Sequence, residues 1–221
     1  MADSEALELP GPEEEIVAPE GMAWSFKKAL ERSAALFLLA LLLPLLLLIA
    51  LFVKLDSRGP VLFIQSRFGQ GGKPFNCYKF RTMHINECDQ SGARQTADVD
   101  SRITRVGFVL RRASLDELPQ IFNVIRGDML LVGPRAHPCG MRVDGQLCED
   151  LNRIYHTRHA VPPGITGWAQ VNGSRGAVKS SQSLQRRVLL DRDYIRNWSL
   201  GRDLSILVRT LGVVFHRGHG V

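Results

Sequence analysis

The chain has 221 residues, which suits one compact domain with an accessory segment and suffices to bury a hydrophobic core. Residues 1–20 hold seven acidic residues and no basic one, so the remainder holds 28 basic and 15 acidic residues, a net charge of +13. A basic body favours an anionic partner such as nucleic acid, a phosphorylated substrate or acidic lipid. The four cysteines contain no CxxC pair, which argues against both a zinc site and a disulfide framework.

The first segment in chain order, residues 1–22, is acidic and contains proline. It offers too little apolar surface to fold alone, so we predict a disordered tail.

An apolar segment follows, Ser33–Val53, which contains no charged residue. As a helix of about 31 Å it is long enough to cross a bilayer core. Pro44 lies near its middle and predicts a kink. Basic residues flank both ends: Lys27, Lys28, Arg32, Lys54 and Arg58. Because basic flanks favour the cytoplasmic side, a bent helix that enters and leaves by one leaflet fits, and an ordinary kinked transmembrane helix fits equally well.

The chain after this segment begins with a predicted β-hairpin. Val61–Gln65 and Phe75–Thr82 are typical of strands, and Gly69–Pro74 is typical of a turn. The turn lacks the spacing of a phosphate-binding P-loop. Residues 84–102 are polar and predict a loop.

Two short helices are predicted next, the first over Val106–Arg112. Ser114 followed by Glu117 matches a capping box, which predicts a second helix from this point to Gly127. A capping box explains Ser114 and Glu117 without any function. It does not explain why Asp116 and Glu117 stand side by side behind a pair of arginines.

The Asp116–Glu117 pair is our candidate for chemistry. A carboxylate at a helix N-terminus stays ionised, and the same helix end offers backbone N–H groups to a phosphate. An ionised Asp116 is therefore suited to attack phosphorus and to form an acyl phosphate. The neighbouring acid is suited to hold Mg²⁺, a hard cation that prefers oxygen ligands.

Two loops rich in glycine and proline follow. A predicted strand at Met129–Val132 leads into Gly133–Pro138, which presents Arg135 as in a binding loop. Val161–Gly173 is the second loop, with a predicted strand at Trp168–Val171. From the residues alone, a plain turn explains the first loop equally well.

The C-terminal part, from about Leu184, is predicted to be helical. A basic amphipathic helix with Tyr194 and Trp198 fits the headgroup layer of a membrane, and a helix packed on the domain core is the alternative. His156 and His159 lack a third metal ligand and are interpreted as ordinary surface or loop residues.

Five motifs taken together resemble those of a known family. They are Tyr78–Met83 (YKFRTM), Leu115–Gln120 (LDELPQ), Val132–Arg135 (VGPR), Pro163–Gly173 (PGITGWAQVNG) and Asp193–Ser199 (DYIRNWS). In this order they resemble the bacterial sugar transferases, the monotopic phosphoglycosyl transferases that initiate exopolysaccharide, capsule, O-antigen or glycoprotein glycan assembly. Larger relatives carry transmembrane helices and a soluble domain before this unit, so we expect a short family member or the catalytic portion of a longer protein.

The resemblance implies a fold and a location. We expect an α/β (α+β) fold, namely a small membrane-associated catalytic domain with a short β-hairpin and C-terminal amphipathic helices. Residues 23–58 would form a re-entrant membrane helix broken at Pro44. Residues 59–221 would form a catalytic domain on the cytoplasmic face of the bacterial inner membrane.

The resemblance also implies a reaction and its residues. Asp116 would attack a UDP-sugar, release UMP and pass hexose 1-phosphate to undecaprenyl phosphate; glucose is favoured and galactose comes next. Glu117 would complete an acidic dyad that holds Mg²⁺ with Asp116. The expected substrate-binding residues are Lys79, Arg81, Arg111, Pro134 and Arg135. Membrane phospholipids are expected partners, nucleic acid is not, and a homodimer is left open.

Two other functions compete with this one. A membrane-bound phosphohydrolase of UDP-sugars would use the same aspartyl chemistry with water as acceptor. A non-enzymatic membrane adaptor would bind acidic lipid or nucleic acid through its basic face, in a manner sensitive to salt. The adaptor leaves the Asp116–Glu117 pair unexplained.

Overall fold

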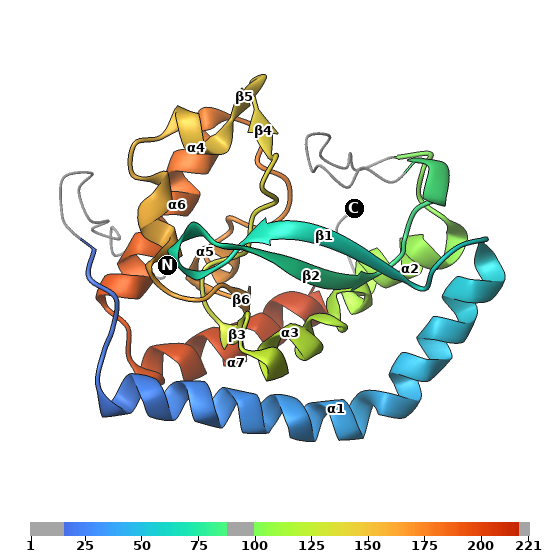
Figure 1. Ribbon diagram of the computed structural model, residues 1–221, viewed down its shortest axis with the longest axis horizontal. Helices are drawn as coiled ribbons and strands as arrows, with labels where there is room; N and C mark the ends of the chain where they lie inside the picture. The colour runs from blue at the N-terminus through green and yellow to red at the C-terminus, as the bar shows by residue number, and fades with distance from the viewer. Residues whose placement is uncertain (1–15, 88–99, 217–221) are drawn as a thin grey trace.

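The computed structural model describes residues 16–87 and 100–216. Most of the predicted acidic tail and most of the predicted loop at 84–102 therefore lie outside the described residues. The described chain forms a mixed α/β structure in which a long N-terminal helix runs along one side of a domain of small sheets and helices (Figure 1). The predicted mixed fold class with a hairpin and C-terminal helices is confirmed.

Helix α1 (Met22–Asp56) continues through Pro44 and bends along its length (Figure 1). Proline removes one helical hydrogen bond, which permits a bend without ending the helix. Its buried residues follow helical spacing and are Trp24, Lys27, Glu31, Ala35, Leu46, Ile49 and Val53. Among the described helices α1 is long and apolar enough to cross a membrane, and only 17% of its apolar 18-residue window is buried. The exposed apolar face is consistent with membrane association.

Strands β1 (Leu62–Phe68) and β2 (Pro74–Phe80) form the predicted antiparallel hairpin, in which Leu62 pairs with Phe80 and Phe68 with Pro74. The 3₁₀ turn η1 (Gln70–Gly72) joins them; its Gly71 has a φ of 65°, a left-handed conformation that glycine adopts without strain.

A second sheet brings together two segments that are far apart in sequence. Strand β3 (Leu130–Val132) pairs in parallel with β6 (Gly164–Thr166). Strands β4 (Arg142–Val143) and β5 (Gln146–Leu147) form a small separate hairpin. The β3–β6 pair matters for function because both predicted Gly/Pro loops adjoin it.

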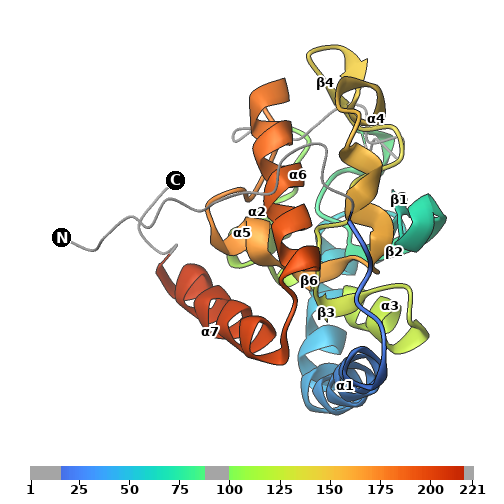
Figure 2. The same cartoon turned by 90° about the vertical axis from the view of Figure 1, so that its left-hand side faces the viewer.

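The remaining described elements are helical. They are η2 (Ile85–Glu87), α2 (Arg105–Ala113), η3 (Leu115–Glu117), α3 (Gln120–Arg126), α4 (Cys148–Leu151), η4 (Tyr155–Ala160), α5 (Trp168–Val171), α6 (Ser181–Arg196) and α7 (Leu200–His216). Viewed nearly along α1, Figure 2 shows α7 and the β1–β2 hairpin on opposite sides of α6.

Both ends of α1 pack on the same domain. Near its start, Trp24 packs in a cluster with Val132 of β3 and Ile206 of α7. Near its end, Val53 packs with Phe80 of β2 and other residues. Each large apolar side chain buried in this way stabilises the fold by roughly 1.5–3 kcal/mol. The helix is therefore attached along its length and not only at one end.

The predicted capping box at Ser114 is wrong. Ser114 has a φ of 58°, and it ends α2 with its backbone N–H bonded to the Arg111 carbonyl. Its side chain makes no capping bond to η3, because a capping residue needs an extended backbone. The hydroxyl instead accepts a hydrogen bond from Arg175. The helix end at Gly127 is confirmed, with a φ of 89° and bonds to the Asn123 and Val124 carbonyls.

The predicted strand at Trp168–Val171 is also wrong, because this segment is helix α5. The Val171 N–H bonds back to the Gly167 carbonyl in a helical turn. Tertiary contacts favour this turn: the guanidinium of Arg202 lies 4.1 Å from the centre of the Trp168 ring. Packing of this kind overrides the weak strand preference of tryptophan and valine.

The membrane-surface role predicted for Tyr194 is wrong. Tyr194 is 1% exposed, and its hydroxyl donates to Asp203 at 2.7 Å. Trp198 is half-buried and donates to the same carboxylate. The core-packing alternative therefore holds for α6.

The two histidines differ in exposure. His156 is exposed as predicted, whereas His159 is buried against the Phe68 ring. The described residues contain no group of three or more His, Cys, Asp or Glu that could hold a metal ion. Cys77, Cys139 and Cys148 are free thiols, as expected, and Cys88 lies outside the described residues.

Candidate active site

The acidic pair lies on η3, at the point where α2 turns into α3. Thr104 caps the start of α2 by accepting a hydrogen bond from the Gly107 N–H at 3.0 Å. Gly107 lets α2 approach the end of β2, because a Cβ there would lie 2.2 Å from the Thr82 carbonyl oxygen. This close approach brings η3, and with it Asp116 and Glu117, against β2.

Glu117 is held by two bases from different elements. Lys79 of β2 donates to Oε1 at 2.6 Å. Arg135, which follows β3, donates from Nη1 to Oε2 at 3.1 Å and from Nη2 to Oε1 at 2.5 Å. A bidentate arginine and a lysine on one carboxylate fix its position strongly. Three of the predicted site residues are thus brought together from segments far apart in sequence.

The two neighbouring carboxyls differ in pKa. Burial opposes charge on Glu117, but Arg135 and Lys79 outweigh it and hold the pKa of Glu117 well below its ordinary value. Burial raises the pKa of Asp116; Lys79 and Arg111 lower it and the negative charge of Glu117 raises it, and the net direction is upward. Within the described residues the Asp116 carboxylate accepts no hydrogen bond, so its oxygens are available to react.

Arg111 and Arg81 differ in where they lie relative to the acidic pair. Arg111, at the end of α2, donates to the Thr82 hydroxyl at 3.4 Å and contributes to the electrostatic field at Asp116. Arg81 is 2% exposed and donates to the Val53 carbonyl at 3.2 Å and to the Ser57 carbonyl at 2.6 Å. Its described contacts therefore hold the end of α1, and the structure does not bring Arg81 together with the acidic pair.

The loop that carries Arg135 is fixed by the second Gly/Pro loop. The Gly133 N–H donates to the Thr166 carbonyl at 2.9 Å, and the Gly164 N–H donates to the Pro134 carbonyl at 2.8 Å. A Cβ on Gly164 would lie 2.1 Å from the Gly133 nitrogen, so the close approach of the two loops requires glycine. Pro134 is buried in this junction and does not project toward Glu117 in any described contact.

Sequence reasoning missed a buried ion pair behind this loop. Arg158 of η4 donates to the Arg135 carbonyl at 2.6 Å and pairs with Asp191 of α6 at 2.7 Å. Both side chains of the pair are 1% exposed. The pair joins the Arg135 loop to α6, and no local motif could reveal it because its members lie on separate elements.

Asn123 of α3 was missed as well. It is fully buried, its amide donates to the Asn76 carbonyl at 2.7 Å, and its oxygen accepts from the Tyr78 N–H at 3.1 Å. These bonds hold α3 against β2 and so maintain the distance between Glu117 and Lys79. The one available signal was a polar residue between the apolar residues Phe122 and Val124.

Asp116 is better suited than Glu117 to serve as a ligand of Mg²⁺. Both oxygens of Glu117 already accept charge-assisted hydrogen bonds, whereas those of Asp116 have no described donor. Mg²⁺ in proteins commonly uses one or two carboxylates together with water and substrate phosphates. The donor set therefore suits a cation shared between Asp116 and a phosphorylated substrate.

The long apolar helix is consistent with membrane association. The acidic pair with its lysine and arginine neighbours is suited to phosphate chemistry. The family model described as bacterial sugar transferase matches residues 22–217, and the chain belongs to this family.

Three curated relatives are similar over most of the chain. The undecaprenyl-phosphate glucose phosphotransferase of Komagataeibacter xylinus is 52% identical over 185 residues, covering 84% of this chain and 35% of that protein. The exopolysaccharide production protein PSS of Rhizobium leguminosarum bv. phaseoli is 46% identical, covering 88% and 97%. The UDP-glucose:undecaprenyl-phosphate glucose-1-phosphate transferase of Caulobacter vibrioides is 49% identical, covering 84% and 68%. The chain therefore spans about a third of the first relative and nearly all of the second.

Proposed function

We propose that this protein transfers glucose 1-phosphate from UDP-glucose to undecaprenyl phosphate, releases UMP and so initiates exopolysaccharide assembly. Family membership and the names of the relatives at 52% and 49% identity support the reaction and the donor. The name of the relative at 46% identity supports the link to exopolysaccharide. The observation that carries the chemistry is an Asp116 carboxylate with no hydrogen-bond donor in the described part of the chain, next to a Glu117 that Lys79 and Arg135 hold in place.

In the first step, a carboxylate oxygen of Asp116 attacks the β-phosphorus of the UDP-sugar. The bond between that phosphorus and the bridging oxygen breaks, and UMP leaves with the electron pair. The product is an acyl phosphate that joins Asp116 to the sugar phosphate. Arg111, whose charge acts on Asp116, stabilises the negative charge that develops on the phosphoryl oxygens.

In the second step, a phosphate oxygen of the lipid acceptor attacks the same phosphorus. The acyl P–O bond breaks, the Asp116 carboxylate is regenerated, and a polyprenyl diphosphate sugar leaves. Glu117 stays ionised in both steps because Lys79 and Arg135 stabilise its negative charge. Its role is to position these two bases around the reacting phosphate, and it does not form a bond to the transferred phosphosugar.

Mg²⁺ is the proposed metal, and Asp116 would hold it together with oxygens of the substrate. When bound, it would neutralise charge on the phosphates. Glu117 would act on the cation through its charge, from its ion-paired position, and not as a direct ligand. This role is narrower than the one expected from the sequence, in which Glu117 and Asp116 both hold Mg²⁺.

A re-entrant α1 fits the way in which both of its ends are held. Near the start, Lys27 is buried and bonds to the Val132 carbonyl and to Asp203. Near the end, Arg81 bonds to the Val53 and Ser57 carbonyls. A polar domain cannot extend through a bilayer, so a helix bonded to it at both ends has both ends on one side. The basic flanks make that side cytoplasmic.

The test is UMP release by detergent-purified protein with Mg²⁺ and a panel of UDP-sugars, with and without undecaprenyl phosphate. We expect sustained release that needs the lipid and favours UDP-glucose over UDP-galactose. Steady release without lipid would replace the transferase with the phosphohydrolase. Absence of release with every donor, together with salt-sensitive lipid binding, would favour the adaptor.

A further inference from the structure

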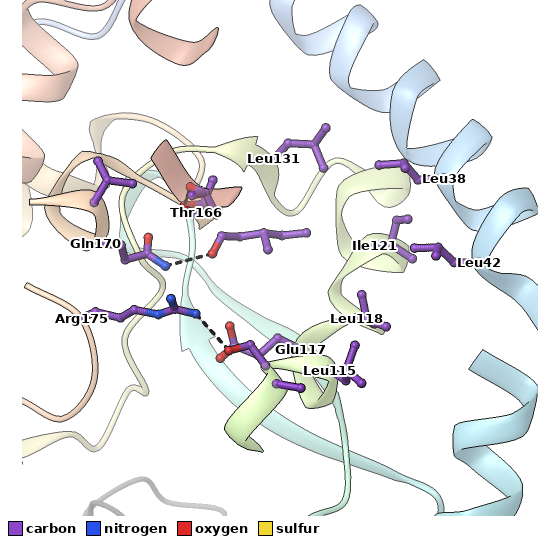
Figure 3. A pocket seen from close by; sticks show the side chains of 15 residues that line it. Leu38, Leu42, Leu115, Glu117, Leu118, Ile121, Leu131, Thr166, Gln170 and Arg175 are labelled. Carbon is purple, nitrogen blue, oxygen red and sulfur yellow. Dashed lines mark hydrogen bonds between the residues drawn. The ribbon is translucent and has the colours of Figure 1, made fainter. Parts of the chain in front are cut away.

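A cavity of about 360 Å³ has Glu117 of the acidic pair in its wall, next to Ser114 and Leu115. Figure 3 shows it between α1 and the η3–α3 segment on one side and the β6–α5 region on the other. Its apolar wall is formed chiefly by Leu38 and Leu42 of α1 and by Leu115, Leu118 and Ile121. Its volume falls within the range of about 300–1,000 Å³ that is typical of small-molecule sites.

The two ends of this cavity differ in chemistry. At one end the wall belongs to α1, whose neighbouring side chains Phe37 and Leu41 are 70% and 64% exposed. At the other end lie Glu117 and Arg175, and Arg175 donates to the Ser114 hydroxyl at 3.0 Å. Figure 3 shows Arg175 and Glu117 at one border of the cavity and Leu38 and Leu42 at the opposite border.

An occupant must match both ends. The sugar and uridine of the donor are polar and would lose hydrogen bonds to water against a wall of leucine and isoleucine. A phosphorylated lipid matches the apolar wall with its chain, and its negative head complements the positive charge of Arg175. The apolar α1 lines the cavity, so a chain coming from the bilayer reaches it along a continuous apolar surface.

We propose that this cavity receives the isoprene units next to the phosphate of the polyprenyl acceptor and so selects an isoprenoid chain. The inference rests on the proposed function, because it assigns the acceptor of that reaction to a specific site. Leu38 and Leu42 then give α1 a second task besides anchoring, since they form part of a substrate site.

The first test fills the cavity from α1 with Leu42→Trp and, separately, Leu38→Trp. The control is Leu41→Trp, which adds the same side chain at a position that is 64% exposed. Two quantities are measured for each protein: the burst of UMP released without acceptor, and kcat/KM for undecaprenyl phosphate. The burst counts protein molecules with an intact donor step, so it also corrects for any misfolded fraction.

We expect the burst to persist in all three variants. For undecaprenyl phosphate, kcat/KM should fall at least about tenfold in the two filled variants, equivalent to ~1.4 kcal/mol, and stay within about twofold in the control. Unchanged kcat/KM in the filled variants with normal turnover would refute the cavity assignment and leave the transferase intact. Loss of the burst in a filled variant that keeps the wild-type thermal unfolding midpoint would also refute it, because the cavity would then serve the donor step.

A second measurement needs no substitution. A polyprenyl phosphate that carries a photoreactive group near its phosphate is cross-linked to the wild-type protein, and the labelled peptides are sequenced. Labelling should include Leu115–Ile121 or the α1 segment around Leu42, and unlabelled undecaprenyl phosphate should compete. Equal competition by phosphatidylglycerol would assign the cavity to an ordinary acyl chain, and labelling confined to other segments would remove the site. The wild-type burst separately reports whether the proposed function itself fails.

Discussion

Asp116 and Glu117 are adjacent in sequence but have opposite electrostatic environments. Glu117 accepts hydrogen bonds from Lys79 and Arg135, and its pKa lies well below its ordinary value. Asp116 has no described hydrogen-bond donor, and burial raises its pKa. A carboxylate that accepts three hydrogen bonds from two cations is a poor nucleophile, whereas one that accepts none from the described residues is available. This difference supports Asp116 as the proposed nucleophile.

Asp116→Asn should abolish turnover and the UMP burst, because an amide oxygen cannot form the acyl phosphate. The variant should remain folded, since Asp116 makes no described hydrogen bond. Asp150→Asn is the matched control, because Asp150 is an exposed acid outside the site. UMP release and the thermal unfolding midpoint are measured for both. Burst activity in Asp116→Asn would exclude Asp116 as the nucleophile.

The pH dependence of the first step should report on Asp116. Asp116 must be ionised to attack, so the burst rate falls as pH drops through its raised pKa. Glu117→Gln removes a negative charge that raises this pKa and frees two cations that lower it. We therefore expect the acid limb of the rate profile to move to lower pH, whatever happens to the maximal rate. An acid limb that stays in place or moves upward would assign the titration to another group.

Among the elements, α1 carries the apolar surface that is consistent with membrane association. Lys27, near its start, is hydrogen-bonded to β3 and α7. The carbonyls of Val53 and Ser57, at its end, accept hydrogen bonds from Arg81, which follows β2. Pro44 lies in the helix between these two attachments, and Figure 1 shows that the helix bends along its length. Because both ends meet one polar domain, a straight passage across the bilayer would place charged groups in lipid.

Cysteines introduced at Met22 and Arg58 should both be labelled by an impermeant thiol reagent from the cytoplasmic side. Both positions are exposed at the ends of α1. Cys88 and Cys139 are first replaced with serine, whereas Cys77 and Cys148 are buried. Labelling is compared in inside-out and right-side-out membrane vesicles. Labelling of the two sites from opposite sides of the membrane would instead favour an ordinary transmembrane helix.

For the whole molecule, a buried polar network connects α1 to the C-terminal helices. Lys27 is 1% exposed and bonds to Glu31 at 2.6 Å and to Asp203 at 2.8 Å. Asp203 also accepts from Tyr194 and Trp198, and Glu31 accepts from the Leu131 N–H. The network therefore joins β3, α6 and α7 to the start of α1, and its single cation balances two carboxylates.

Lys27→Met should destabilise the protein by about 3–5 kcal/mol, because it leaves two buried carboxylates without their cation. Lys28→Met is the matched control, since the neighbouring Lys28 is exposed. Thermal unfolding of both variants is followed in the same detergent. Equal midpoints for Lys27→Met and the control would show that the network contributes no more than a surface charge.

Much of the fold was predictable because local patterns determine it. The hairpin at residues 62–80, the helix over 105–113 and the stop at Gly127 follow from alternation, periodicity and a glycine with positive φ. Local patterns failed at Ser114 and at Trp168–Val171, where contacts with Arg175 and Arg202 accompany the observed conformation. Such contacts come from distant segments, so no window of sequence contains them.

The sequence by itself determined that this protein has a long apolar helix, a basic body and an acidic pair beside arginines. These features depend on composition and order alone. Only the tertiary structure decided that Glu117 is ion-paired while Asp116 accepts no hydrogen bond from residues 16–87 and 100–216, that Arg81 holds α1, and that Tyr194 is buried. Each of these features is a contact between side chains of different elements, among them β2, η3, the loop after β3 and the helices. Such contacts form only when the hydrophobic faces of these elements pack together.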